Sequence, residues 1–153
     1  GPKVLEFNCR FGDPETQAML PRLESDLLEI LWAAAHGEPL PAAAEWRPGV
    51  AVGVVMASRG YPASSSKGDV ISGIEKAWAV DGADAFHAGT YRGPDRKLVT
   101  AGGRVLTVTG QGDTFAEARA RAYEAVACIS FDGAQHRSDI ALRAEEWEKR
   151  QGV

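Results

Sequence analysis

Glu6 and Asn8 are the first residues along the chain whose types and spacing suggest chemistry. They lie two positions apart in Val4 to Asn8, a stretch whose period-two alternation predicts a β-strand. On a strand, this spacing places the carboxylate of Glu6 and the amide oxygen of Asn8 on one face. Such hard oxygen ligands suit Mg²⁺ beside nucleotide phosphates. The pair is a candidate metal site, with a solvated, hydrogen-bonded strand face as the alternative.

A cation and a second carboxylate follow this pair. Arg10 and Asp13 flank Gly12, and the next residues, Pro14 and Glu15, suit the first turn of a helix. Arginine can bind a carboxylate or a phosphate through two parallel hydrogen bonds, and Asp13 can accept hydrogen bonds from a substrate amine. Arg10 and Asp13 are therefore candidate catalytic residues, and Asp13 is also a candidate for substrate binding. The alternative is an ion pair between them that fixes the turn.

Arg104 is a second candidate for substrate binding. It begins a predicted strand on which it shares a face with Leu106 and Val108. A cation at the edge of a buried surface needs an anionic partner. That partner is either a phosphate or carboxyl group of a substrate or a carboxylate of the protein itself.

His87 and Lys67 are weaker candidates. Imidazole can transfer protons near neutral pH, but a hydrogen-bonded structural role is the expectation for His87. Lys67 follows three serines and could neutralise a phosphate, although a solvated loop lysine is expected.

Helical signals lie on both sides of the predicted strands. A short helix is expected over 15–20, and a second begins after Ser25, forms a core face with its leucines and ends at Gly37. Thr114 and Glu117 form a capping box at the start of a third helix with an apolar stripe.

The middle of the chain predicts a sheet. Val50 to Ser58 is nearly all apolar, as in a strand covered on both faces. Shorter strands are expected at 69–71, 85–90, 97–100 and 104–109. A charged helix follows over 138–150, with Leu142 and Trp147 as anchors. Strands followed by helices predict an α+β fold, a small mixed, mainly antiparallel sheet with flanking helices.

Composition narrows the classes of protein. The 153 residues are 44% hydrophobic and 25% charged, as in one globular domain. A net charge of −4 without a basic block argues against nucleic acid or an anionic membrane as a partner. Cys9 and Cys128 form no metal motif and suit a reducing cytoplasm. The longest apolar run, Gly49 to Ala57, is too short for a membrane span.

The run Glu6 to Gln17, Glu-Phe-Asn-Cys-Arg-Phe-Gly-Asp-Pro-Glu-Thr-Gln, resembles the signature of the phosphoribosylamine-glycine ligases, which are ATP-grasp enzymes of purine biosynthesis. The resemblance covers nearly the whole chain and continues through Ser25 to Leu27, Val54 to Pro62, Lys67-Gly68, Phe86 to Thr90 and Gly102 to Leu106. One segment departs from the family: Ala63 to Ser66 stands where its members usually carry Gly-Asp-Tyr.

The resemblance implies a fold and a set of sites. Residues 1–22 would be the end of the ATP-grasp domain, with the metal-binding strand and a short helix, and 23–150 the C-terminal domain of the ligase. Glu6 and Asn8 would bind the Mg²⁺ or Mn²⁺ that bridges ATP phosphates. Arg10 and Asp13 would line the same cleft.

The implied reaction is phosphorylation of glycine by ATP, followed by attack of phosphoribosylamine on the glycyl phosphate. The products are glycinamide ribonucleotide, ADP and phosphate. The sequence lacks a glycine-rich phosphate loop and a segment that could hold adenine, and it begins without a methionine. We therefore expect the C-terminal portion of the ligase, inactive alone.

Two alternatives remain open at this point. One is a non-catalytic lobe that packs on, or pairs with, a separate ATP-grasp half. The other is a different purine-pathway ATP-grasp ligase. In each case we expect the missing N-terminal and ATP-grasp domains as partners, and an exposed apolar interface that favours self-association.

Overall fold

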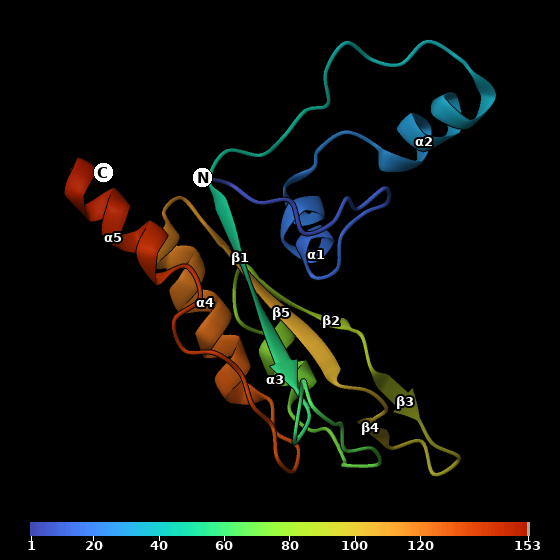
Figure 1. The fold of residues 1–153 in the computed structure, drawn as a ribbon, viewed down its shortest axis with the longest axis vertical. Coiled ribbons are helices and arrows are strands. Elements are labelled where there is room, and N and C mark those ends of the chain that lie inside the picture. Colours follow the sequence, from blue (N-terminus) through green and yellow to red (C-terminus); the bar gives the residue numbers. More distant parts are fainter. Residues whose placement is uncertain (153) are drawn as a thin grey trace.

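The computed structural model describes residues 1–152 as an α+β fold, which confirms the predicted class (Figure 1). In chain order the elements are α1 (Glu15–Met19), the 3-10 helix η1 (Leu20–Arg22), α2 (Leu27–His36), β1 (Val50–Ala57), α3 (Ile74–Trp78), β2 (Ala83–His87), β3 (Thr90–Arg92), β4 (Leu98–Thr100), β5 (Arg104–Gly112), α4 (Phe115–Cys128) and α5 (Leu142–Gln151). None of the helices among these residues is both long and apolar enough to cross a membrane.

The main sheet is antiparallel, with β5 between β1 and β2. β3 and β4 form a separate antiparallel hairpin. The strand expected at 69–71 is reduced to a single bridge between Val70 and Val99. The strand expected at 85–90 ends at His87, and β3 begins at Thr90.

One face of the sheet is packed by α3 and α4. Val54 of β1 and Val108 of β5 are fully buried on this face, against Ala118 and Ala122 of α4. A Cβ at Gly110 would meet the backbone of α4 at Ala118 and Ala122, so glycine allows this close approach. The predicted apolar stripe of α4 is therefore confirmed.

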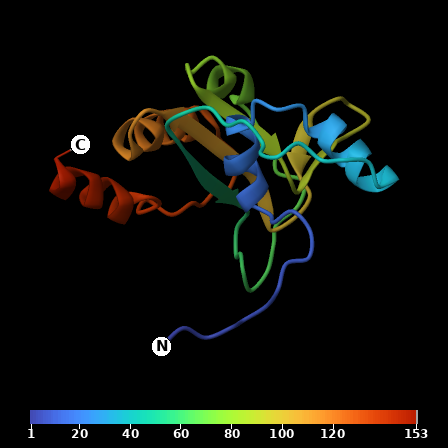
Figure 2. The ribbon, with the colours of Figure 1, turned by 90° about the horizontal axis from the view of Figure 1, so that it is seen from above.

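The opposite face is covered only in part. Burial along β1 alternates, so that Val52 and Val54 are buried while Gly53 and Val55 are half-buried. Gly53 faces Ala18 of α1. Figure 2 shows α1 and the first residues on the side of the sheet away from α3. The expectation that β1 is buried on both faces holds for one face only.

A β-bulge in β5 changes the direction of Arg104. The register shifts after Met56, so that Ala57 pairs with Arg104 rather than with Val105. Arg104 therefore lies on the half-covered face, opposite to that of Leu106. The prediction that the two share a face is wrong, because one extra residue in the strand breaks the period-two alternation.

The predicted strand from Val4 to Asn8 is not formed. Residues 1–14 contain no helix or strand. A strand needs a hydrogen-bonded neighbour, and Val4 to Asn8 pairs with no other part of the described chain. Its apolar side chains also lack a surface to pack on, since Leu5 is 96% exposed.

Helix α2 ends at the predicted glycine, but it begins one residue later than predicted and lacks the predicted core face. Asp26, not Ser25, is its N-cap and accepts hydrogen bonds from two backbone N–H groups, and Gly37 ends it with a positive φ. No residue of α2 is buried, and Leu28 is 71% exposed. Helical spacing predicted an apolar face, but the sheet lies too far away to cover it (Figure 1).

The start of α4 is capped both locally and from a distance. Thr114 Oγ1 accepts a hydrogen bond from the Glu117 backbone N–H at 3.2 Å, as predicted for a capping box. The Glu117 carboxylate accepts from the backbone N–H of Asp113 rather than from that of Thr114. The carboxylate of Glu148 in α5 accepts from the backbone N–H of Phe115 at 2.7 Å.

Helix α5 is anchored by a residue of unexpected type. Glu148 is buried, whereas Trp147, predicted as an anchor, is 55% exposed, and Leu142 is also exposed. Glu148 rather than Trp147 is buried against α4 because its carboxylate accepts a hydrogen bond from the Phe115 backbone N–H. This N–H is one of the groups that the first turn of a helix leaves without a partner.

Candidate functional site

Asp13 and Arg104 form the centre of the candidate site, although 91 positions separate them. Nη2 of Arg104 lies 3.3 Å from Oδ2 of Asp13, and Nη1 donates to the Asp13 backbone carbonyl at 2.8 Å. The side chains remain 38% and 48% exposed for Arg104 and Asp13, respectively. The structure thus brings two predicted site residues together at a position that a ligand can reach.

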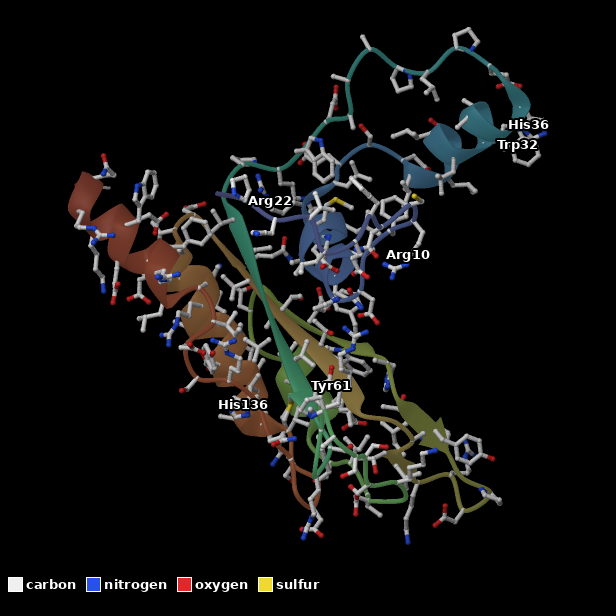
Figure 3. All side chains as sticks on the ribbon, in the orientation of Figure 1. Arg10, Arg22, Trp32, His36, Tyr61 and His136 are labelled. Carbon is white, nitrogen blue, oxygen red and sulfur yellow. The ribbon has the colours of Figure 1, made fainter. Side chains whose placement is uncertain are left out.

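The anionic partner of Arg104 in this structure is a carboxylate of the protein. The sequence left open a substrate group or a carboxylate of the protein, and the structure shows the carboxylate of Asp13, which is itself a candidate site residue. Arg10 does not pair with Asp13. Its Nη1 donates to the backbone carbonyl of Phe11 at 3.0 Å, and Figure 3 shows its side chain at the outer edge of the loop before α1.

Helix α1 fixes the loop that carries Asp13. The Gly12 carbonyl accepts hydrogen bonds from the backbone N–H and the hydroxyl of Thr16. The Glu15 carboxylate occupies the space where a Gly12 side chain would begin. These contacts hold Asp13 at the start of the helix.

Gln17 is a residue of the site that the sequence analysis missed. Its Nε2 donates to Oδ1 of Asp13 at 3.0 Å, so that Gln17 and Arg104 bind different oxygens of one carboxylate. A signal was present, because Gln17 follows Asp13 by four positions, which is one helical turn.

Glu6 and Asn8 meet without a strand. The Asn8 amide donates to Oε1 of Glu6 at 3.3 Å, and both side chains are exposed. The Asn8 oxygen and the Glu6 carboxylate are ligand types that fit Mg²⁺ or Mn²⁺. Within residues 1–152, no group of three or more His, Cys, Asp or Glu could hold a metal ion. The pair thus fits the chemistry of part of a metal site.

His87 and the altered loop have local partners. His87 Nδ1 lies 3.1 Å from the hydroxyl of Thr90, which agrees with a hydrogen-bonded structural role. Ser66, at the end of the altered loop, donates to Asp69, and this hydrogen bond is the main reason that the pKa of Asp69 lies below its usual value. Thr100 also donates to Asp69, at 3.1 Å, so the loop is fastened to β4. Lys67 is exposed beside it.

The fold and the ion pair define a class of protein: a small α+β domain with one sheet face packed by helices and a second face, covered only in part, that carries the Asp13–Arg104 pair. The family model described as "Phosphoribosylglycinamide synthetase, C domain" matches residues 51–143. The chain belongs to this family. The resemblance predicted from the sequence is thereby confirmed.

Individual relatives agree with this assignment. A phosphoribosylamine-glycine ligase of Neisseria meningitidis serogroup A is 52% identical over 143 residues, which cover 94% of this chain and 33% of that protein. One from Escherichia coli O6:H1 is 49% identical over 148 residues, or 97% of this chain and 34% of that protein. The chain thus spans about a third of the length of these curated relatives.

A solved structure extends the likeness to three dimensions. The crystal structure of a phosphoribosylamine-glycine ligase from Thermotoga maritima matches with a TM-score of 0.76 and 38% identity. The match covers 90% of this chain and 33% of that chain. The predicted arrangement of an antiparallel sheet with flanking helices is confirmed by this neighbour.

Proposed function

We propose that this chain is the C-terminal part of a ligase that uses ATP to join glycine to 5-phosphoribosylamine. The curated relatives, of which this chain covers about a third, are named phosphoribosylamine-glycine ligases. The observation that carries the proposal is the contact between Asp13 and Arg104. It joins the signature run at the start of the chain to the beginning of β5, so that two separate motifs contribute to one site.

The two side chains suit two parts of the reaction. The Asp13 carboxylate accepts hydrogen bonds, so it orients the amine of phosphoribosylamine for attack on glycyl phosphate. The Arg104 guanidinium stabilises the negative charge on the carboxyl and phosphoryl oxygens of the intermediate. Positioning and charge stabilisation account for the catalysis in this proposal, and no covalent protein nucleophile takes part.

Glu6 and Asn8 would hold Mg²⁺ or Mn²⁺ together with ligands from the rest of the ligase. When bound, the ion neutralises charge on the ATP phosphates. Arg10 would line the same cleft as an additional cation. The contact between the two side chains supports this assignment, because the hydrogen bond from the Asn8 amide nitrogen to Glu6 Oε1 holds the two residues side by side.

The rest of the ligase is the proposed partner of the first segment. In this proposal, residues 1–22 complete the ATP-grasp domain and 23–150 form the C-terminal domain. The exposed apolar side chains of Val4, Leu5 and Phe7 would then be covered by the missing domains. Without them, the same surface favours self-association. The two free thiols are compatible with a cytoplasmic enzyme.

A chimeric enzyme tests the proposal. This chain replaces the corresponding third of the Neisseria meningitidis ligase, and ADP release is measured with ATP, Mg²⁺, glycine and phosphoribosylamine. We expect ADP release that depends on both glycine and the amine, and none from the isolated chain. Arg104→Gln and Asp13→Asn should each lower kcat/KM by roughly 10²- to 10³-fold.

Arg150→Gln serves as the matched control, because Arg150 is exposed on α5. It should leave turnover unchanged. A folded chimera without glycine-dependent ADP release would overturn the proposed function. Full activity of the Asp13 and Arg104 variants would overturn the proposed site instead.

A further inference from the structure

A pocket of about 320 Å³ lies beside the carboxyl end of β1. Its floor is formed by Val55 and Ala57, one wall by Tyr61 and Pro62, and the other by residues 135–137. Figure 3 shows Tyr61 and His136 on either side of the end of β1. The pocket is thus formed between two loops that are far apart in the sequence.

Hydrogen bonds hold the two loops in place. The backbones of Ala57 and Gln135 exchange two hydrogen bonds, at 2.8 and 3.0 Å. The Gln135 side chain donates to the carbonyl of Ser58 at 2.9 Å and to that of Tyr61 at 3.0 Å. The shape of the pocket is therefore fixed before any ligand binds.

The pocket and the Asp13–Arg104 pair share the open face of the sheet. Ala57, in the floor, is the residue opposite Arg104 in the register. The Tyr61 ring lies against Gly103, the neighbour of Arg104, in the space where a Gly103 side chain would begin. A ligand in the pocket can consequently extend toward Asp13 and Arg104.

The lining is apolar at the floor, and Arg137 places a cation at the rim. Arg137 Nε and Nη2 donate to the Asp139 carboxylate at 2.8 and 2.6 Å, which raises the pKa of Arg137 and lowers that of Asp139. This pair fixes the guanidinium and leaves Nη1 for a ligand. His136 and Arg137 are both lining residues, and no carboxylate is among them. An anion bound without a metal ion suits this set.

We propose that the pocket binds the phosphoribosyl group of the amine substrate. The phosphate lies against Arg137 and His136, the ribose lies over Val55, and the amine points toward Asp13. This assignment rests on the proposed function. ATP is the poorer fit, because its phosphates carry a metal ion and the pocket offers that ion no carboxylate.

Binding to the isolated 153-residue chain tests the assignment directly. Ribose 5-phosphate is the probe, with ribose and inorganic phosphate as comparisons, and binding is followed by calorimetry and by NMR shifts of residues 55–62 and 135–137. We expect ribose 5-phosphate to bind more tightly than either comparison. Arg137→Gln should weaken it roughly ten- to hundredfold, and Arg150→Gln should not. Inorganic phosphate binding as tightly as ribose 5-phosphate would overturn the assignment.

The chimeric ligase separates this inference from the proposed function. There, Arg137→Gln should raise KM for phosphoribosylamine and leave KM for glycine and ATP unchanged. An active chimera in which this variant alters KM for ATP or glycine instead would overturn the subsite alone. If the chimera is inactive, the proposed function fails, and the ribose 5-phosphate titration decides the pocket: saturable, Arg137-dependent binding supports it, and no binding overturns it.

Discussion

The two faces of the main sheet use the same strands for different purposes. On the α4 face, Val54 and Val108 are fully buried, and Gly110 lets the helix approach closely. On the open face, Val55 is half-buried and Arg104 reaches Asp13. The helix-covered face therefore holds the domain together, while the open face, although Thr107 and Thr109 are buried on it, keeps the Asp13–Arg104 pair within reach of a ligand. Stability and function can be altered separately in this domain.

Neighbouring valines of β1 give the largest expected contrast. Val54→Ala removes two methyl groups from the buried face and should lower the free energy of unfolding by about 2–3 kcal/mol. Val55→Ala, one position later on the open face, should lower it by less than about 1 kcal/mol. Urea denaturation of both variants measures the difference. Equal losses would show that the open face is as important for stability as the packed one.

Two glycines, one on each face of the sheet, test the same comparison because a side chain at each would meet different surroundings. Gly110→Ala places a Cβ against the backbone of Ala118 and Ala122, so the free energy of unfolding should fall by about 1–3 kcal/mol. Gly53→Ala meets its nearest atoms at 3.6 Å, an ordinary contact, and should be neutral or stabilise by up to about 1 kcal/mol. Thermal unfolding followed by circular dichroism compares the two. A stable Gly110→Ala variant would contradict the close approach of α4.

The ion pair of the open face should have the smallest effect on stability. Arg104→Gln removes a half-exposed pair and should cost less than about 1 kcal/mol, with a smaller loss at high salt. Urea denaturation at low and at high salt measures this cost. A loss above about 2 kcal/mol would make Arg104 a structural residue and remove the separation between the faces.

The sequence predicted features that depend on local chemistry. The capping box of Thr114 and Glu117 was found because its partners lie within one helical turn. The end of α2 at Gly37 was predicted correctly because glycine readily adopts the positive φ that a helix C-cap requires. The short helix after Pro14 followed from the same kind of local signal.

Features that depend on distant partners could not be predicted in this way. The bulge at Val105 redirects Arg104, and no residue type in β5 marks it. The alternation of Val4 to Asn8 indicated a strand, but only a neighbouring strand can form its hydrogen bonds. The contact between Asp13 and Arg104 spans 91 positions, so each was a separate candidate until the fold joined them.

The carboxylate of Glu148 has a consequence for the order of folding during synthesis. Thr114 and Glu117 can cap α4 as soon as its first turn leaves the ribosome. The Phe115 N–H, in contrast, waits for a carboxylate 33 positions further along. The full cap of α4 can therefore form only after Glu148 has also left the ribosome.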